Sequence, residues 1–255
     1  HLSIRRQRQM CIRDSSGIAT SLKVIKDGAG NQSALAISDD QVKIVPENDD
    51  TTTVFNVLDK DGDTKFVVDS TNDLVKALGH IVNTNIQNFY LVHTAAIPAT
   101  TDTWAALGVG GGGRTQSGSI QEAGTGGTPS TSFTISTTAH TLIPYYFYIP
   151  FNIAIDSCHV WFASDTATGD AVKFSIMSYT VDSANGSTGG DLSSGVENCA
   201  SSAAITSAGY EQAYYQSLTV STANVDSGKV IMAFCHQDGT NSDLSVKMQL
   251  VYHLR

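Results

Sequence analysis

The sequence predicts an all-β protein in which short N-terminal β repeats precede a C-terminal antiparallel β-sandwich. Strand-forming residues greatly outnumber long helix-forming patterns. Residues 171–181 alternate in character, with Val172, Phe174 and Ile176 on one face and Lys173 and Ser175 on the other, as a half-buried strand requires. Gly, Asp and Asn residues that favour turns separate the apolar segments. These three observations favour strands over helices.

Residues 16–107 are the predicted β-repeat shaft or attachment region, because a weak duplication runs through the first part of this range. Val24 matches Val57, and Asp40-x-Val42-Lys43 matches Asp73-x-Val75-Lys76. Asp-Gly pairs mark hairpin turns between the short strands. One such unit has too little apolar surface to fold alone, so we expect it to stack on neighbouring repeats or on other chains.

A glycine-rich stretch at residues 108–130 follows the repeat region. Nine glycines lie between Gly108 and Gly127. Polar sequence of this kind buries little apolar surface. We therefore predict a linker, or loops that lie against another subunit.

Residues 131–255 are the predicted C-terminal β-sandwich head domain. Apolar segments of strand length lie near residues 132–137, 142–149, 153–163, 171–181, 214–221, 229–236 and 243–253. This many short strands in one domain is typical of a sandwich or a jelly roll.

The opening residues 1–15 differ in composition from the remainder of the chain. Four of the six arginines lie here, at Arg5, Arg6, Arg8 and Arg13. A basic arm for nucleic acid or membrane, a targeting segment and adapter-derived sequence are the possible interpretations. We favour the last, and expect residues 1–15 to be non-native sequence outside the functional interpretation.

Charge and hydropathy disfavour nucleic acid and membranes as partners. The formal net charge is −9, which repels phosphate backbones. The longest apolar runs fall short of the ~18 residues that span a bilayer, so we expect a soluble protein without membrane insertion. Cys158 and Cys235 lie in apolar strand patterns, where buried reduced thiols are usual, and this fits assembly in a reducing cytoplasm.

The sequence contains no familiar catalytic or cofactor motif, so we expect no enzymatic activity, no cofactor and no bound metal. GxSxG, HExxH and P-loop patterns are all missing. Asp59-Lys-Asp-Gly-Asp63 has calcium-like spacing, but Gly62 is misplaced for an EF-hand, and a hairpin turn is favoured over a cation site. For His159 and His236, a core or hydrogen-bonded role is favoured over metal ligation.

Aromatic clusters and one long loop supply the candidate binding residues. The clusters at Tyr145–Tyr148 and around Tyr214 suit a core or subunit interface, or a surface that contacts a glycan or protein. Trp161 is interpreted as a core or interface residue. The polar loop from Asp182 to Glu197 is either a recognition loop or a plain connection. The candidate receptor contacts are Asp182, Asn185, Asp191, Tyr210, Tyr214 and Tyr215.

Two parts of the chain resemble fibre proteins of bacteriophages. The pattern Phe55-x-Val57-x-Asp59-x-Asp61-Gly62-x-x-x-Phe66-x-Val68-Asp69 resembles the shaft repeats of tail and receptor-binding fibres. The segments Ile149-Pro-Phe-Asn-Ile-x-Ile155, Asp165-Thr-Ala-Thr-Gly-Asp170 and Ala223-Asn-Val-Asp226-x-Gly228 are similar to terminal β domains of fibre-like virion proteins of marine phages.

This resemblance implies a homotrimer in the virion, assembled in the host cytoplasm. The repeats would form a fibrous shaft attached at its N-terminal end to other virion proteins. The jelly-roll head would contact a host-surface glycan or protein. A capsid-associated head fibre or decoration protein is one alternative. A fibre-borne glycan depolymerase is another, although the C-terminal carboxylates lie mostly in turn contexts.

Overall fold

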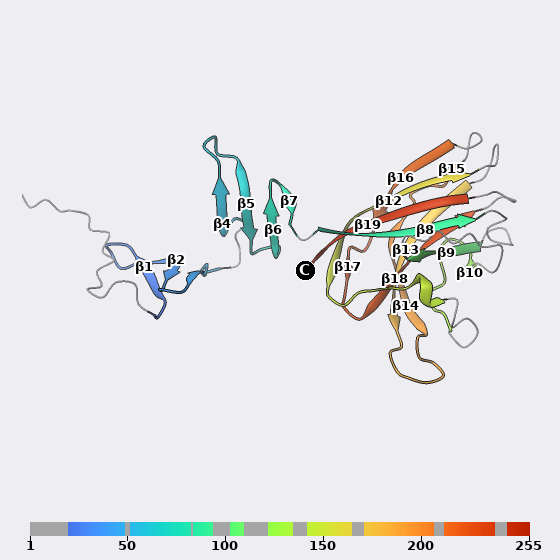
Figure 1. Ribbon diagram of the computed structural model, residues 1–255, viewed down its shortest axis with the longest axis horizontal. Coiled ribbons are helices and arrows are strands. Elements are labelled where there is room, and N and C mark those ends of the chain that lie inside the picture. Colours follow the sequence, from blue (N-terminus) through green and yellow to red (C-terminus); the bar gives the residue numbers. More distant parts are fainter. Residues whose placement is uncertain are drawn as a thin grey trace, which may run out of the picture. The chain divides into compact units, whose positions relative to one another are not determined.

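The chain folds into two compact β units (Figure 1). The computed structural model describes residues 20–48, 52–82, 84–93, 103–109, 122–134, 142–164, 171–206, 212–237 and 244–255. These ranges contain strands and no α-helix, which confirms the predicted all-β class. The units comprise His1–Val82 and Asn83–Arg255. The predicted non-native residues 1–15 lie outside the described ranges.

The first unit consists of two small antiparallel sheets. One contains β1 (Lys23–Lys26), β2 (Gln32–Ile37) and β3 (Val42–Ile44), and the other contains β4 (Phe55–Leu58), β5 (Thr64–Asp69), β6 (Leu74–Ala77) and β7 (His80–Ile81). Each sheet opens with the same arrangement of three consecutive antiparallel strands. The duplicated sequence therefore corresponds to a duplicated structure.

The first turn of each sheet is built around an aspartate. Its Oδ1 accepts hydrogen bonds from the backbone N–H groups two and four residues later: Asp27 from Ala29 and Asn31, and Asp59 from Asp61 and Asp63. A glycine with positive φ completes each turn, Gly30 at 92° and Gly62 at 89°. The segment from Asp59 to Asp63 thus forms the predicted hairpin turn, and Lys65 Nζ lies 2.9 Å from Asp59 Oδ2.

The second unit is a closed antiparallel barrel with extra strands at its margins. Its elements are β8 (Thr84–His93), β9 (Thr103–Val109), β10 (Glu122–Thr125), η2 (Ile143–Tyr145), β11 (Phe147–Tyr148), β12 (Ile153–Ser164), β13 (Ala171–Val181), β14 (Leu192–Ala200), β15 (Ile205–Thr206), β16 (Gln212–Val220), β17 (Asn224–Val225), β18 (Lys229–Gln237) and β19 (Leu244–Leu254). The ring runs β9-β8-β19-β12-β16-β14-β13-β18 and closes through β18 and β9.

The structure is a barrel and not the predicted sandwich, because two short strand pairings, here called seams, join the edges of its two sheets. β8 pairs with β9 only at Phe89↔Val109 and Tyr90↔Gly108, and β14 pairs with β16 only at Cys199↔Val220 and Ala200↔Thr219. Between the seams lie two four-stranded sheets, β8-β19-β12-β16 and β9-β18-β13-β14. The strand count suggested two packed sheets, but the seams pair their edges and so remove the open edges of a sandwich.

The barrel interior is filled by one apolar cluster from both sheets. The predicted inward residues Val172, Phe174 and Ile176 belong to it, together with Phe89 and Phe162. Eight strands leave an interior just wide enough for side chains. The interior is therefore a core and not a ligand chamber.

A second cluster covers the outside of the β9-β18-β13-β14 sheet. Met177 and Phe234 project outward from the sheet and are buried beneath a layer that includes Ala123, Leu142 and Tyr145. Part of the predicted linker at residues 108–130 therefore belongs to the barrel unit, because β10 and residues 126–130 pack on the β9-β18-β13-β14 sheet of the same chain. Strands β8 and β9, expected within the 16–107 repeat region, also belong to this unit.

The sequence predicted no individual strands at β8 and β9, and it did not predict β14. Strand β14 occupies residues expected in the loop from Asp182 to Glu197, so the loop ends at Asp191. Ser194 has a positive φ of 53°, and the pairing of β14 with β13 is irregular at two points. The expected strand at 142–149 is instead η2 followed by the short β11. In the expected strand at 132–137, Phe133 makes only an isolated bridge to Leu192.

Gly195→Ala should destabilise the barrel. A Cβ at Gly195 would lie 2.8 Å from the Thr131 Cα and 2.6 Å from a Tyr179 ring carbon, so the variant should lose about 1–3 kcal/mol of unfolding free energy. Gly127→Ala is the matched control, because nothing lies within 4 Å of its added Cβ. Denaturant unfolding followed by fluorescence measures both, since Trp104 and Trp161 lie in the barrel. Equal stabilities of the two variants would contradict the packing.

Acid should weaken the two N-terminal sheets. Hydrogen bonds from the Asn31 side chain to Asp27, and from Lys65 to Asp59, together with backbone N–H groups, hold the pKa of both carboxyls below 3.8. Because the folded pKa is the lower one, this stabilisation is present above the unfolded pKa and is lost as the pH falls through the folded pKa. Carbon-13 NMR titration of the two carboxyls should give midpoints below 3.8, and midpoints at or above that value would count against these turns.

Candidate functional site

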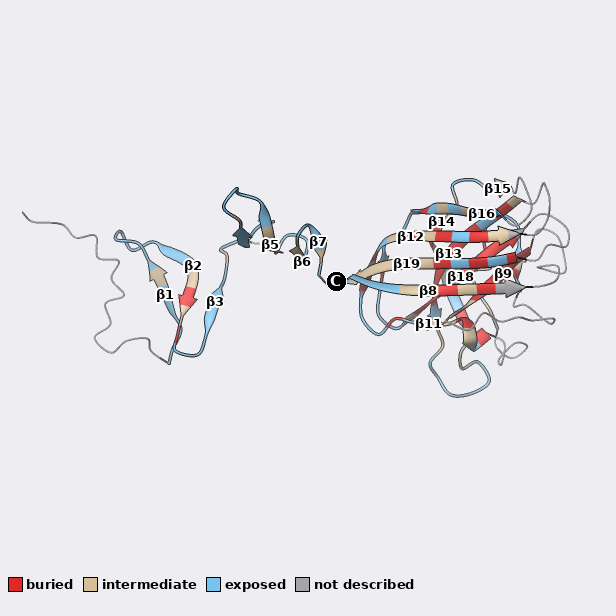
Figure 2. Ribbon diagram, turned by 45° about the horizontal axis from the view of Figure 1, so that its top comes forward, coloured by how far each residue is buried: buried red, intermediate tan, exposed pale blue. Residues whose placement is uncertain are grey.

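The described residues leave the outer face of the β8-β19-β12-β16 sheet exposed to solvent. Along β12, Cys158, Val160 and Phe162 are buried in the interior, whereas His159 and Trp161 point outward. Figure 2 shows the same alternation of buried and outward residues along β19 and β8. This face differs from the outer face of the other sheet, which a second apolar cluster covers.

Strand pairing gathers aromatic side chains at the middle of this face. One row across the sheet consists of Tyr90, Lys247, Trp161 and Tyr215, and the next consists of Asn88, Gln249, His159 and Ser217. We call Tyr90, His159, Trp161 and Tyr215, with Lys247 between them, the aromatic face. Lys247 carries the only formal charge in these two rows, so the aromatic face is locally neutral to positive on an acidic protein.

The aromatic face is held rigidly by contacts among its own side chains. Trp161 is 40% exposed and Tyr215 is 53% exposed, and their ring centroids are 5.2 Å apart. The His159 Nδ1 lies 2.9 Å from the Tyr215 hydroxyl, and its Nε2 lies 3.0 Å from Ser157 Oγ. Either tautomer satisfies both bonds, because the two hydroxyls can donate or accept. The Tyr215 ring is therefore fixed before any partner arrives, and His159 is hydrogen-bonded as predicted.

The buried cysteines are poor candidates for chemistry. Cys158, Cys199 and Cys235 are free thiols inside the barrel. Contact with Cys199, together with burial, raises the pKa of Cys158 well above its usual range, and burial raises the pKa of Cys235 to about 12. Both thiols stay protonated at neutral pH and are weak nucleophiles. They act as small apolar core residues, as the sequence predicted.

The predicted receptor contacts on the 182–191 loop lie far from the aromatic face. The loop leaves the end of β13 where Val181 pairs with Leu192, on the far side of the β14–β16 seam from Tyr215. At ~3.3 Å per residue, the path along the strands is on the order of 40 Å. The structure therefore separates the loop contacts Asp182, Asn185 and Asp191 from Tyr214 and Tyr215.

The loop residues mainly hold the loop itself together. Asp182 Oδ1 accepts a hydrogen bond from the Ala184 N–H at 2.9 Å, and such bonds lower the pKa of this carboxyl. The Tyr146 hydroxyl donates to the Gly190 carbonyl at 2.7 Å. Asn185 is exposed in the loop, and Asp191 is half-buried at its end.

The predicted tyrosines differ in their surroundings. The Tyr214 ring stacks on Phe162, with centroids 5.1 Å apart, at the edge of the interior core. Tyr215 is exposed on the outer face, and Tyr210 lies outside the described residues. Adjacent strand residues point to opposite faces, so only Tyr215 of this described pair can contact a partner there.

Sequence reasoning missed most of the aromatic face. Trp161 was interpreted as a core or interface residue, and its exposure excludes the core. The signal was present in the alternation of β12, because Trp161 is in phase with Ser157 and His159 and out of phase with Val160. Tyr90 and Lys247 come from distant strands, and only the pairing register places them beside Trp161.

Comparison with known protein families and curated proteins found no match. No protein-family model matches the chain, and no curated protein matches it. Among the residues that the structure describes, no helix is long and apolar enough to cross a membrane. Within the same ranges, no group of three or more His, Cys, Asp or Glu side chains could hold a metal ion.

Proposed function

We propose that this chain is a fibre-like attachment protein of a virion, and that its barrel binds a host-surface glycan through the aromatic face. The observation that carries the proposal is the rigid pair of exposed rings, Trp161 and Tyr215, at the centre of an uncovered sheet. Exposed apolar patches mark contact surfaces on proteins, and aromatic residues are enriched in such surfaces.

The composition of the aromatic face suits a sugar. Aromatic rings supply rigid apolar planes against which the C–H faces of sugar rings can pack, and they lose little conformational entropy on binding. Around the rings lie hydrogen-bonding groups from Asn88, Gln249 and Lys247. The Gln249 Nε2 donates to Asn88 Oδ1 at 3.4 Å, which holds both amides beside the rings.

The N-terminal sheets support assembly with other copies of the chain. A single layer of three or four short strands needs a second layer to cover its apolar face, and apolar side chains lie exposed on these sheets. Val42 and Leu78 are each 70% exposed, and Leu58 is 51% exposed. Burial of these side chains between copies would stabilise the sheets. A homotrimeric shaft, attached to other virion proteins at its N-terminal end, follows from the resemblance to phage fibres.

The full chain should be a trimer at micromolar concentration, because its N-terminal sheets need partners. Size-exclusion chromatography with light scattering should give about three times the chain mass of 27.0 kDa. Leu58→Lys should shift the chain toward monomer, because a charge would enter the buried contact. Lys60→Glu, a change at an exposed position in the adjoining turn, serves as control. A strict monomer would contradict the proposed trimeric shaft.

Glycan binding should depend on the aromatic face. Trp161→Ala and Tyr215→Ala should each weaken binding to an immobilised panel of neutral, sialylated and sulfated glycans by at least about tenfold, as expected for central aromatic contacts. Phe151→Ala is the matched control, because Phe151 is an aromatic residue that is even more exposed, at 63%, and lies outside the four strands of this face. An equal loss of glycan binding in all three variants would refute this site. Glycan binding that neither Trp161→Ala nor Tyr215→Ala changes would also refute it.

A further inference from the structure

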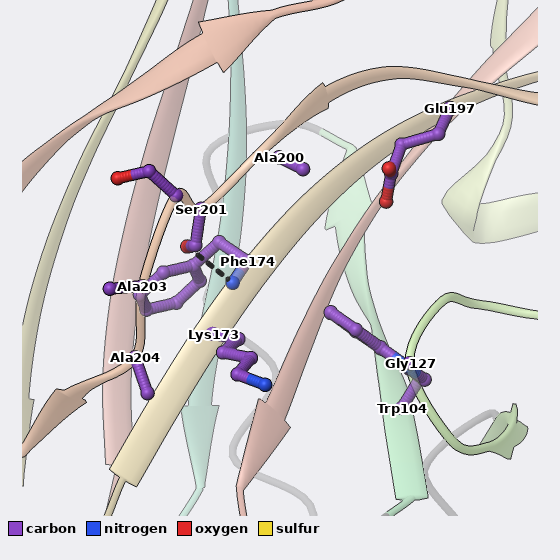
Figure 3. Close-up of a pocket in the computed structure, with 10 residues that line it drawn as sticks. Trp104, Gly127, Lys173, Phe174, Glu197, Ala200, Ser201, Ala203 and Ala204 are labelled. Atoms are coloured by element: carbon purple, nitrogen blue, oxygen red, sulfur yellow. Dashed lines mark hydrogen bonds between the residues drawn. The ribbon is translucent and has the colours of Figure 1, made fainter.

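A pocket lies on the other sheet of the barrel, away from the aromatic face. Its volume is about 340 Å³, at the lower end of the range for small-molecule sites. Gly127 lies at one side, and residues 200–204 form another wall (Figure 3). We call it the Trp104 pocket, and its lining includes Trp104, Gly127, Lys173, Glu197, Ser201 and Ala203.

Hydrogen bonds fix the wall at residues 200–204. Ser201 Oγ accepts from the Phe174 N–H at 2.9 Å and donates to Gln216 Oε1 at 2.7 Å. The Ser201 N–H donates to the Phe174 carbonyl at 2.9 Å, and Gln216 Nε2 donates to the Ala203 carbonyl at 3.1 Å. The wall is therefore set in place before a ligand binds, which lowers the entropic cost of binding.

The opposite wall is fixed in the same way. The Trp104 Nε1 donates to the Gly126 carbonyl at 3.0 Å, which ties the turn before Gly127 to β9. The Trp104 ring contacts His236, with centroids 5.0 Å apart. Alanine side chains at positions 200, 203 and 204 keep the space between the walls open.

Two opposite charges line the pocket without pairing with each other. Ser175 is fully buried, and its hydroxyl donates to Glu197 Oε1 at 3.0 Å. This bond holds the carboxylate in position, and the described residues give its Oε2 no hydrogen bond. Lys173 comes from β13, two residues before Ser175, and makes no ion pair with a described residue. Figure 3 shows the Lys173 ammonium and the Glu197 carboxylate as separate groups, and both residues line the pocket.

We propose that the Trp104 pocket binds a small zwitterion, such as a free α-amino acid, with its carboxylate on Lys173 and its ammonium group on Glu197. The two contacts are charge-assisted hydrogen bonds, which are stronger than neutral ones. The uncharged part of the ligand would lie against the alanine wall.

Other ligand classes fit the charges less well. A simple anion would meet Glu197 and the net charge of −9, and a simple cation would meet Lys173. A neutral sugar would leave both charges without a counter-charge, and Trp104 is too deeply buried to offer its ring face for stacking. A zwitterion offers a counter-charge to both groups at once.

Calorimetric titration of the full chain tests this site. The probes are free α-amino acids, their N-acetyl and amide derivatives, and a neutral monosaccharide, each at up to roughly 10 mM so that millimolar dissociation constants are seen. At least one free amino acid should bind, and capping either of its charged groups should weaken binding about tenfold or more. Equal binding of a doubly capped derivative or of the sugar, or no binding by any free amino acid, would overturn the proposal.

Variants locate the binding in this pocket. Lys173→Met and Glu197→Gln should each weaken amino-acid binding about tenfold, and the exchange of both charges in K173E/E197K should restore part of it. Lys247→Met removes a lysine from the aromatic face and should leave amino-acid binding unchanged. Circular dichroism confirms that each variant is folded. Binding unaffected by both single variants, or lost equally in Lys247→Met, would place the ligand elsewhere.

Discussion

The apolar interior shared by two four-stranded sheets constrains everything else in the C-terminal unit. Each strand gives alternate side chains to this core, and large residues such as Phe89, Phe162 and Phe174 fill it. A barrel of eight strands has no room for a ligand beside such side chains. Any ligand of the barrel would therefore contact the outer side chains, and these differ sharply between the two sheets.

The outer faces differ because described residues after β9 cover one sheet and not the other. Residues 122–134 and 142–146 provide a layer that buries Met177 and Phe234 on one sheet. The same layer stops short of the Lys173 and Glu197 positions, and a polar pocket is left beyond its edge. The other sheet receives no such layer from the described residues, so Trp161 and Tyr215 stay exposed. One covering layer on one sheet thus accounts for the difference between the exposed aromatic face and the Trp104 pocket.

The sequence predicted those features that the local residue pattern determines. Strands β12, β13, β16, β18 and β19 were expected close to their observed positions, because each is an apolar or alternating segment of strand length bounded by turn residues. Strand β14 was not predicted, since its Ser194, Gly195 and Glu197 carry no apolar period and its pairing is irregular. Barrel closure was also unpredictable, because each seam consists of two residue pairs between distant segments. Both candidate sites depend on such long-range pairings.

The two units are stabilised by different interactions. The N-terminal sheets rest on local Asp turns and leave apolar residues such as Val42 and Leu78 exposed. Their stability therefore rises with any association that covers those side chains, because binding to the folded state alone stabilises it. The barrel, in contrast, buries large apolar residues such as Phe89, Phe162 and Phe174 in an interior of its own. Association is therefore expected to change the stability of the N-terminal sheets more than that of the barrel.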